Sequence, residues 1–275
     1  MRLLAFLTAC VLGSAPAFAQ DLQSHCIALA EGDPNVHYVS NGAGLAPDEV
    51  RIAYVGHSTF TIQTPSGLTA ATDFTGFAGP GVTPDVVTMN NAHSSHWTPY
   101  PDPAIPHVLH GWAKDGVAAD HRLTLGDFEM LVRNVPTNVR SRFGEEGRLD
   151  GNSIFIFEVA GLCIGHLGHL HHEPSERHYA LMGRLDVVMA PVDGGLTLDL
   201  PTMIRVLKRV KAQVVLPMHW WGPSSLTVFI EGMRDEFAIE AIDEGSITVS
   251  LRDLPRTPVV KVLRPGGLIG FDLDD

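Results

Sequence analysis

The chain has 275 residues, of which 45% are hydrophobic and 18% are charged, a composition typical of a globular protein with a sizeable core. Its formal net charge of −12 and the lack of any Lys/Arg cluster exclude a nucleic-acid partner, which needs concentrated positive charge. Fourteen histidines are many for such a chain, and they are the first indication of metal chemistry.

The first residues predict export. A basic residue precedes an apolar run over 3–12, and the Ala-Phe-Ala at 17–19 is a small-x-small cleavage signal, so 1–19 is interpreted as a cleaved signal peptide. The apolar run is shorter than the roughly 20 residues that a transmembrane helix needs. We therefore expect a periplasmic or secreted protein that begins at Gln20 and has no membrane span. The alternative, a lipoprotein cleaved before Cys10, would leave an unusually short signal.

Beyond the signal, the chain divides into an N-terminal extension over 20–48 and one folded domain over 49–275. Cys26 lies in the extension and Cys163 in the domain, and an oxidising compartment permits a disulfide between them. The apolar run Leu162–Ile164 favours the other alternative, in which Cys163 is a small buried hydrophobic residue.

Short β-rich runs are joined by helical patterns in the second half of the chain, which indicates an α/β fold. Two continuous apolar runs are typical of buried strands, and the turn Ala160-Gly161 predicts a hairpin. Asp199 is a plausible N-cap for a helix between the last two predicted strands. In chain order the predicted strands cover 52–55, 60–63, 68–72, 86–89, 153–159, 162–167, 187–192 and 214–218, and the predicted helices cover 173–184, 201–212 and 224–237.

Four groups of histidines each follow an apolar run directly. Residues just beyond strand ends project into loops at one edge of a sheet, where α/β proteins place their sites, so the four groups can converge. Neutral imidazole is the commonest zinc ligand and also suits copper and iron. The groups are His57; His93 and His96; His166, His169, His171 and His172; and His219. The histidines expected to be solvated or structurally bonded are His25, His37, His107, His110, His121 and His178.

A series of motifs accompanies these histidines in a fixed order. They are Gly56–Phe60, Thr72-Asp73, Gly151–Ile154, the Pro-Val-x-Gly-Gly turn within 186–195, and Pro217–His219. Together they resemble the metallo-β-lactamase superfamily, in particular its lactonase-like branch that includes ascorbate-phosphate lactonases and phospholipase-D-type relatives. The resemblance implies a four-layer αβ/βα sandwich with metal ions at one edge.

The sequence departs from the principal signature of that family, T-H-x-H-x-D-H, which aligns with 90–96. At the first metal position His93 is kept, whereas Asn91 and Val139 stand where the family has histidines. The resemblance therefore implies that the first metal position has lost its ligands and is empty.

The second metal position keeps more of its ligands in this alignment. His96 and His219 are retained, Ser95 replaces a carboxylate, and His169 replaces the bridging aspartate. Three imidazoles, with a possible fourth from His93 or His57, satisfy one tetrahedral or five-coordinate ion. We therefore predict a site for one divalent metal ion with His93, His96, His169 and His219 as ligands. Zinc is the first choice, with copper and iron as alternatives.

An ion with an open position makes bound water acidic enough to attack a carbonyl or phosphoryl centre near neutral pH. This predicts a metal-dependent hydrolase of a small ester, lactone or phosphoester. Because Ser95 cannot be a strong base, Asp73, His57 and Asp193 are the candidates for orienting the nucleophile. Asp73 is also expected to accept a hydrogen bond from a ligand imidazole.

Two other functions remain open at this point. Four histidines that closed around the ion would make a non-catalytic periplasmic metal-binding protein, with His171 and His172 as an access patch. An all-histidine site without a bridging carboxylate also suits a copper or iron redox enzyme.

The substrate is expected to be a small molecule. Aromatic residues next to the motif histidines can line an apolar cleft, and Trp220 is the main candidate among them. Arg140 can pair with an anionic substrate group, although a surface salt bridge is an equally good interpretation of it. The other aromatic candidates are Trp97, Tyr100, Trp112 and Trp221.

Overall fold

The computed structural model describes residues 24–28, 44–141 and 147–266. The predicted signal peptide and its cleavage point lie outside these residues. None of the helices within them is long and apolar enough to cross a membrane.

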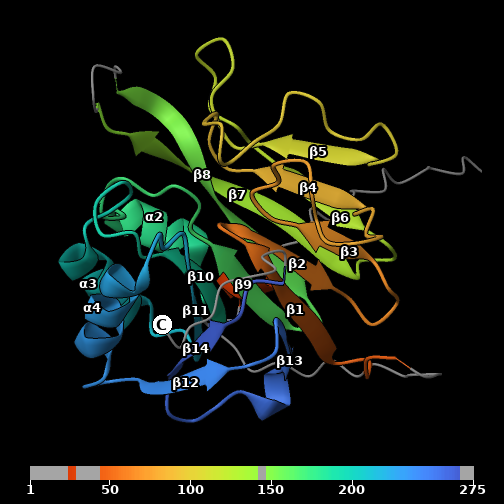
Figure 1. Ribbon diagram of the computed structural model, residues 1–275. Coiled ribbons are helices and arrows are strands. Elements are labelled where there is room, and N and C mark those ends of the chain that lie inside the picture. The colour runs from red at the N-terminus through yellow and green to blue at the C-terminus, as the bar shows by residue number, and fades with distance from the viewer. Residues whose placement is uncertain (1–23, 29–43, 142–146, 267–275) are drawn as a thin grey trace, which may run out of the picture.

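Two β-sheets form the centre of the domain (Figure 1). The six-stranded sheet has the order β13-β1-β2-β3-β4-β5 and the eight-stranded sheet has the order β12-β14-β11-β10-β9-β8-β7-β6. The strands of the first sheet are β1 (Glu49–Gly56), β2 (Thr59–Gln63), β3 (Thr69–Ala71), β4 (Val86–Met89), β5 (His107–His110) and β13 (Ser246–Ser250). Those of the second are β6 (Arg122–Leu125), β7 (Met130–Val139), β8 (Arg148–Val159), β9 (Leu162–His166), β10 (Val187–Pro191), β11 (Val214–Met218), β12 (Ala238–Ile242) and β14 (Val259–Leu263).

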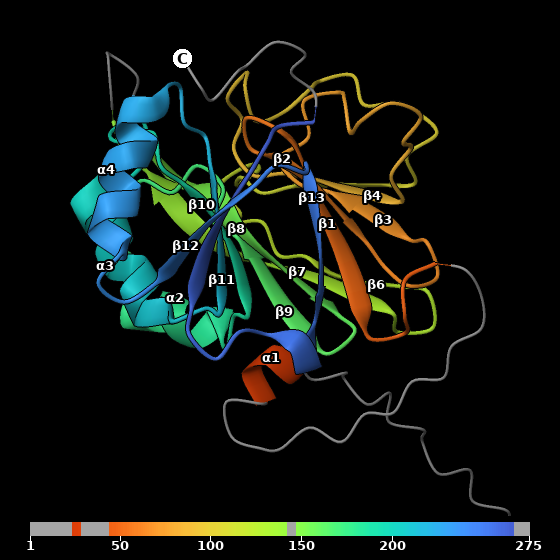
Figure 2. The same cartoon turned by 60° about the horizontal axis from the view of Figure 1, so that its bottom comes forward.

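Three helices pack on the outer face of the eight-stranded sheet, as Figure 2 shows. They are α2 (Glu176–Met182), α3 (Leu200–Val210) and α4 (Pro223–Met233). A short helix α1 (His25–Ala28) and a 3₁₀ turn η1 (Leu251–Asp253) complete the described elements. The helix boundaries follow local signals: Asp199 accepts the N–H of Thr202 and caps α3, and Ser175 makes a capping box with α2.

The main apolar core lies between the two sheets, where β1, β2 and β4 face β7, β8 and β9 through side chains such as Ile52, Phe60 and Phe157. A second core joins the eight-stranded sheet to the helices. On its other face the six-stranded sheet packs Val87 and Met89 against loop residues such as Phe74 and Ile105. This arrangement confirms the predicted α/β sandwich of two sheets.

The N-terminal segment is attached to this sandwich covalently. Cys26 in α1 and Cys163 in β9 form a disulfide, so the interpretation of Cys163 as a lone buried hydrophobic residue was wrong. Beside the disulfide, buried Glu158 accepts hydrogen bonds from the Ser24 hydroxyl and from Nε of Arg133, the latter at 2.7 Å. An apolar sequence context favours burial but does not exclude a covalent partner from a distant segment.

The connectivity gathers several strand ends at one edge of the sandwich. β9, β10 and β11 run parallel in the eight-stranded sheet, and β3 runs parallel to β4 in the other sheet. The segments that leave these strands therefore emerge side by side, as parallel sheets require.

Candidate metal centre

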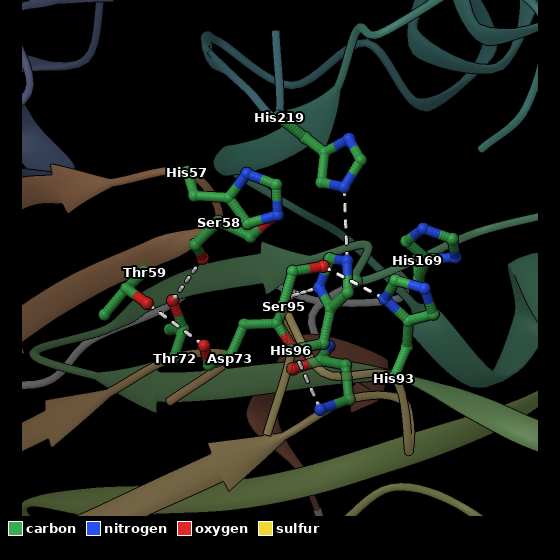
Figure 3. Close-up of polar contacts among 12 residues, drawn as sticks. His57, Ser58, Thr59, Thr72, Asp73, His93, Ser95, His96, His169 and His219 are labelled. Carbon is green, nitrogen blue, oxygen red and sulfur yellow. Dashed lines mark hydrogen bonds and ion pairs between the residues drawn. The ribbon is translucent and has the colours of Figure 1, made fainter. Parts of the chain in front are cut away.

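Three histidines from three different strand ends meet at this edge. His57 follows β1, His96 lies in the segment after β4, and His219 follows β11. One ring nitrogen of each lies within 4.8 Å of the corresponding nitrogens of the other two. Figure 3 shows the three imidazoles facing one another, with His93 and His169 to one side. The two sheets thus contribute to one cluster.

His96 is oriented by a buried carboxylate. Its Nδ1–H donates to Asp73, and both side chains are inaccessible to solvent. Asp73 is fixed in turn by the backbone N–H of Asn90, which donates to its Oδ1 at 3.1 Å. Because Nδ1 is occupied, His96 presents its Nε2 to the centre of the cluster, which is the arrangement expected of an oriented metal ligand.

His219 has the same type of support from another loop. Its Nδ1–H donates to Oδ2 of Asp193 at 2.9 Å. The same carboxylate accepts the backbone N–H of Gly195 at 2.8 Å and the hydroxyl of Thr197 at 2.5 Å. The loop after β10 therefore wraps around Asp193 and holds it against His219.

The donor set fits a metal ion. With both Nδ1 atoms bonded to carboxylates, the Nε2 atoms of His96 and His219 face each other at 3.1 Å, each with its lone pair directed inward. The third nitrogen, Nε2 of His57, is buried and has no hydrogen-bond partner among the described residues. Ligand nitrogens around a tetrahedral zinc ion stand about 3.3 Å apart, as Zn–N distances of about 2.0–2.1 Å require. The spacing of the His96 and His219 nitrogens therefore suits one cation, and the ring nitrogen of His57 within 4.8 Å of them would be its third ligand.

The protonation states agree with this assignment. Burial, and then the neighbouring imidazoles of His219 and His96, lower the pKa of His57 to about 3. Burial and His219 also hold the pKa of His96 well below its usual range. Burial raises the pKa of Asp73 to about 6, which leaves it ionised at neutral pH. Burial alone would raise the pKa of Asp193 too, but hydrogen bonds from His219 and Thr197 lower it. Neutral imidazoles backed by carboxylates are competent ligands at pH 7.

Three residues of the centre have strained backbones. The φ angles of His57, Asp73 and His219 are 52°, 47° and 56°, in the left-handed region that side chains other than glycine seldom adopt. Such conformations cost on the order of 1–3 kcal/mol each and cluster at functional sites. Three of the eight non-glycine residues with positive φ in the described part of the chain thus lie at the centre.

His169 and His93, both predicted ligands, lie beside the three central histidines. The ring centroid of His169 is 4.4 Å from that of His96, but Nδ1 of His169 shares a hydrogen bond of 2.6 Å with Nε2 of His171. His93 is exposed, stacks on His169 at 5.6 Å and bonds Ser95 Oγ at 3.0 Å. The ring of His57, which was predicted as a catalytic residue or a fourth ligand, lies 5.2 Å from that of His96 and 4.3 Å from that of His219. It is the ring nitrogens, and not the ring centroids, that group His57 with His96 and His219.

His166, in the same cluster of loops, has a structural role. Its Nε2–H donates to the carbonyl of Ser58 at 2.8 Å, and its Nδ1 accepts the N–H of Gly168 at 3.1 Å. Both ring nitrogens are thus occupied by backbone groups. It belongs to the scaffold under the site.

The residues at the predicted empty metal position line one pocket. Asn91, Val139 and His93 line a pocket of about 150 Å³ that reaches His219. Oδ1 of Asn91 accepts a hydrogen bond of 2.6 Å from Nη2 of Arg148, a residue that the sequence did not single out. Because Arg148 pairs with Val139 across β7 and β8, the strand register brings this guanidinium to the position.

The two predicted substrate-binding residues have different surroundings. Arg140 lines the small pocket, and its Nη2 donates to the carbonyls of Gly195 and Thr197 at 2.6 and 2.9 Å. Arg140 therefore secures the loop that carries Asp193. Trp220 lines a larger pocket on the other side of the cluster, together with Trp221. The remaining aromatic candidates, Trp97, Tyr100 and Trp112, line neither of these two pockets.

Comparisons with known proteins show which family the chain resembles. The family model described as a Beta-lactamase superfamily domain matches residues 51–219, more than half of the chain. A Thermotoga maritima protein assigned as a zinc-dependent hydrolase of the metallo-β-lactamase superfamily is similar in structure, with 24% identity, a TM-score of 0.56 and coverage of 78% of this chain and 100% of that one. Igni18, a metallo hydrolase from Ignicoccus hospitalis, has 17% identity, a TM-score of 0.53 and coverage of 74% and 99%.

Another of the similar structures is named for a different chemistry. The CmlA β-hydroxylase, in an E377D variant, has 12% identity, a TM-score of 0.52 and coverage of 75% of this chain and 55% of that one. At these identities the structures show a shared fold alone. No protein with a curated function matched the chain in sequence. From the family match and the two-sheet architecture together, the chain belongs to the metallo-β-lactamase superfamily.

Proposed function

We propose that the protein is an exported hydrolase that uses one metal ion, preferably zinc, to cleave a small ester, lactone or phosphoester. One observation carries the proposal: two imidazoles oriented by carboxylates, His96 and His219, present their Nε2 atoms to each other at 3.1 Å, beside the unpartnered Nε2 of His57. These three nitrogens would hold the ion, which when bound would acidify water and polarise a carbonyl or phosphoryl oxygen.

The carboxylates of the site have positioning roles in this proposal. Asp73 and Asp193 each accept an Nδ1–H of a ligand imidazole, so neither is free to act as a general base. Their charge stabilises the ligands, and their position fixes the ring orientation. This replaces the sequence-based hypothesis in which Asp73, His57 or Asp193 orients the nucleophile directly, and it keeps the other role expected of Asp73, as hydrogen-bond acceptor for a ligand imidazole.

Two features favour a single ion. At the other metal position of the family, the Asn91 amide oxygen is bonded to Arg148, a cation that would repel a second metal ion. Val139, which lines the same pocket, has no donor atom. Among the described residues no group of three ligand atoms forms there.

Access to the site favours catalysis over storage of a metal ion. The small pocket reaches His219 and the larger pocket reaches His57, and Ser95 lines both. An ion between them would therefore face space on two sides. A binding protein that retains its ion would be expected to close at least one of these openings.

A redox enzyme is the second candidate, because a histidine cluster without a bridging carboxylate also suits copper or iron. The similarity to the fold of the CmlA β-hydroxylase is consistent with this alternative. Metal analysis of protein purified under native conditions separates the two: zinc supports hydrolysis, whereas stoichiometric copper or iron supports redox chemistry.

The activity test is a panel of small carboxylic esters, lactones and phosphodiesters with metal-loaded protein. We expect turnover of one class that is lost on chelation, lost in His219→Ala, and retained in His107→Ala. His107 is a suitable control because it pairs with Val86, at the end of β4 remote from the site. If loaded protein cleaves no member of the panel, and its cobalt form shows only protein ligands and no exchangeable water, the hydrolase proposal fails.

Export is supported by the disulfide between Cys26 and Cys163, because such bonds persist in oxidising compartments. The test is fractionation of the native host with N-terminal sequencing of the mature protein. A mature protein that begins at Gln20 and is found in the periplasmic or secreted fraction would support the proposal. An intact N-terminus in the cytosol would contradict it.

A further inference from the structure

The larger pocket beside the metal centre is continuous with it. Its volume of about 470 Å³ lies within the range of roughly 300–1,000 Å³ typical of small-molecule sites. His57 and Ser95 form the wall nearest the centre. Figure 3 shows His57 on the side of the cluster away from His93 and His169. The larger pocket is lined by His57, whereas the small pocket is lined by His93 and His169.

The walls of the larger pocket carry no charge. Tyr54, Phe77, Trp220, Trp221 and Pro265 are among the lining residues, and no Asp, Glu, Lys or Arg is. Two of the aromatic side chains are open to solvent, Phe77 at 49% and Trp221 at 65%. Large apolar side chains exposed together in a concave surface mark a ligand site, since leaving them in water is unfavourable.

Trp221 links this apolar surface to the metal ligands. Its ring centroid lies 4.9 Å from that of His57 and 5.9 Å from that of His219. It also lines the small pocket, in which Arg140 and several imidazoles supply polar groups. A molecule that spans the centre would thus meet an apolar wall on one side and a polar one on the other.

We propose that the larger pocket binds an apolar hydrocarbon or aryl group on one side of the scissile ester, with Phe77 and Trp221 determining the preference for it. This assignment of a substrate class rests on the proposed hydrolase function. The polar part of the substrate then occupies the small pocket. Burying a methylene group contributes about 0.8 kcal/mol, so each additional methylene that enters the pocket tightens binding by up to about fourfold.

Binding is measured first without catalysis, by calorimetry with 1-butanol, 1-hexanol and 1-octanol and the metal-loaded protein. We expect Kd to fall at least about tenfold from butanol to octanol. Phe77→Asp places a charge in the apolar wall and should reduce this ratio at least about fivefold. Tyr100→Asp is the matched control, because Tyr100 is 87% exposed and lines neither pocket, and it should leave the ratio unchanged.

Catalysis is measured next, with 4-nitrophenyl esters from acetate to octanoate and with alkyl acetates of increasing chain length. The series whose kcat/KM rises with length identifies the side of the ester that enters the larger pocket. Binding that tightens with chain length in a protein that cleaves no ester, lactone or phosphodiester would leave the pocket assignment intact and count against the hydrolase function. Chain-length-independent binding, or an unchanged ratio in Phe77→Asp, overturns the pocket assignment even if esters are cleaved.

Discussion

The backbone N–H of His219 donates a hydrogen bond of 2.8 Å to the carbonyl oxygen of His57. This bond joins the end of β11 in one sheet to the end of β1 in the other, and the two imidazole centroids lie 4.3 Å apart. Tyr54 donates its hydroxyl to the same carbonyl at 2.9 Å. Two of the three central imidazoles are therefore positioned by main-chain bonds before any ion binds, which reduces the cost of organising the site.

The first prediction concerns the third ligand. His96→Ala and His219→Ala should each weaken zinc binding by more than about 100-fold, because changing only a partner of a ligand already costs about 10–100-fold. His57→Ala should cause a comparable loss, whereas His169→Ala should cause a smaller one, since only His57, His96 and His219 form the group of ring nitrogens within 4.8 Å of one another. Zinc affinity is measured by competition with a chromogenic chelator.

His107→Ala serves as the control in the same assay and should bind one zinc ion per chain with wild-type affinity. If His169→Ala loses the ion and His57→Ala keeps it, the third ligand is His169, as the sequence indicated. Two tightly bound ions per wild-type chain would contradict the one-metal site altogether.

The second prediction tests the carboxylate behind His219. Asp193→Asn keeps the size of the side chain but removes the charge that orients Nδ1–H, so zinc affinity should fall by about 10–100-fold. Asp199→Asn is the matched control, since this nearby residue caps α3 and asparagine caps equally well. Equal affinity in both variants would show that Asp193 does not support the ligand.

Much of the fold could be predicted from local patterns. The apolar runs at β10 and β11 and the capping signal at Asp199 placed a strand–helix–strand unit within a few residues. β7 was not predicted because Arg133, Asn134 and Pro136 interrupt its apolar pattern. Arg133 is tolerated there because Glu158 neutralises it, a partner in the neighbouring strand that no local pattern reveals. β12 was missed for another reason: it is an edge strand whose side chains are mostly exposed or half-buried.

The site could be located from the sequence but not assigned in full. The rule that strand ends carry ligands singled out His57, His96 and His219 within a larger set, but the predicted ligand set contained His93 and His169 and gave His57 only as a catalytic residue or a possible fourth ligand. The rule alone does not separate His166 from His169, which lie three residues apart. The family alignment chose His169, and the hydrogen bonds of His166 to Ser58 and Gly168 show the structural role of His166. Long-range contacts of this kind depend on the packing of two sheets, and one sequence carries no signal for them.

The third prediction concerns stability and pH at the N-terminal attachment. Burial alone would raise the pKa of Glu158, but hydrogen bonds from Arg133 and Ser24 lower it. A carboxyl with a lowered pKa stabilises the folded state above its unfolded pKa, and this stabilisation is lost as the pH falls through the folded value. Glu158→Gln should therefore lower the free energy of unfolding by about 3 kcal/mol at pH 7.

The difference in free energy of unfolding between wild type and Glu158→Gln should shrink as the pH falls below about 4.5, where Glu158 begins to be protonated in the unfolded chain. Urea unfolding at pH 7, 5 and 3.5 measures it, with Glu231→Gln as a control on the exposed face of α4. A difference that stays constant over this range would mean that the charge of Glu158 does not contribute to stability.

The fourth prediction concerns Gly168, which lies just before His169 and has a φ of +60°. A Cβ there would come within 2.5 Å of Nδ2 of Asn90 and 2.8 Å of Oδ1 of Asn152. Asn90 Nδ2 donates to the Ser153 carbonyl, and Asn152 Oδ1 accepts the His169 N–H, so Gly168→Ala should displace both side chains and loosen the support of the site.

Gly81 has a similar φ of +71° but nothing within 4 Å of its Cβ position. Gly81→Ala therefore isolates the cost of the left-handed backbone, about 1 kcal/mol. Gly168→Ala should cost a further 1–3 kcal/mol, roughly the cost of overpacking, and should also weaken zinc binding, which Gly81→Ala should not. Urea unfolding measures the free energy of unfolding of the two variants, and chelator competition measures their zinc affinity. Equal losses of stability and of zinc affinity in both variants would show that the packing around Gly168 does not support the metal centre.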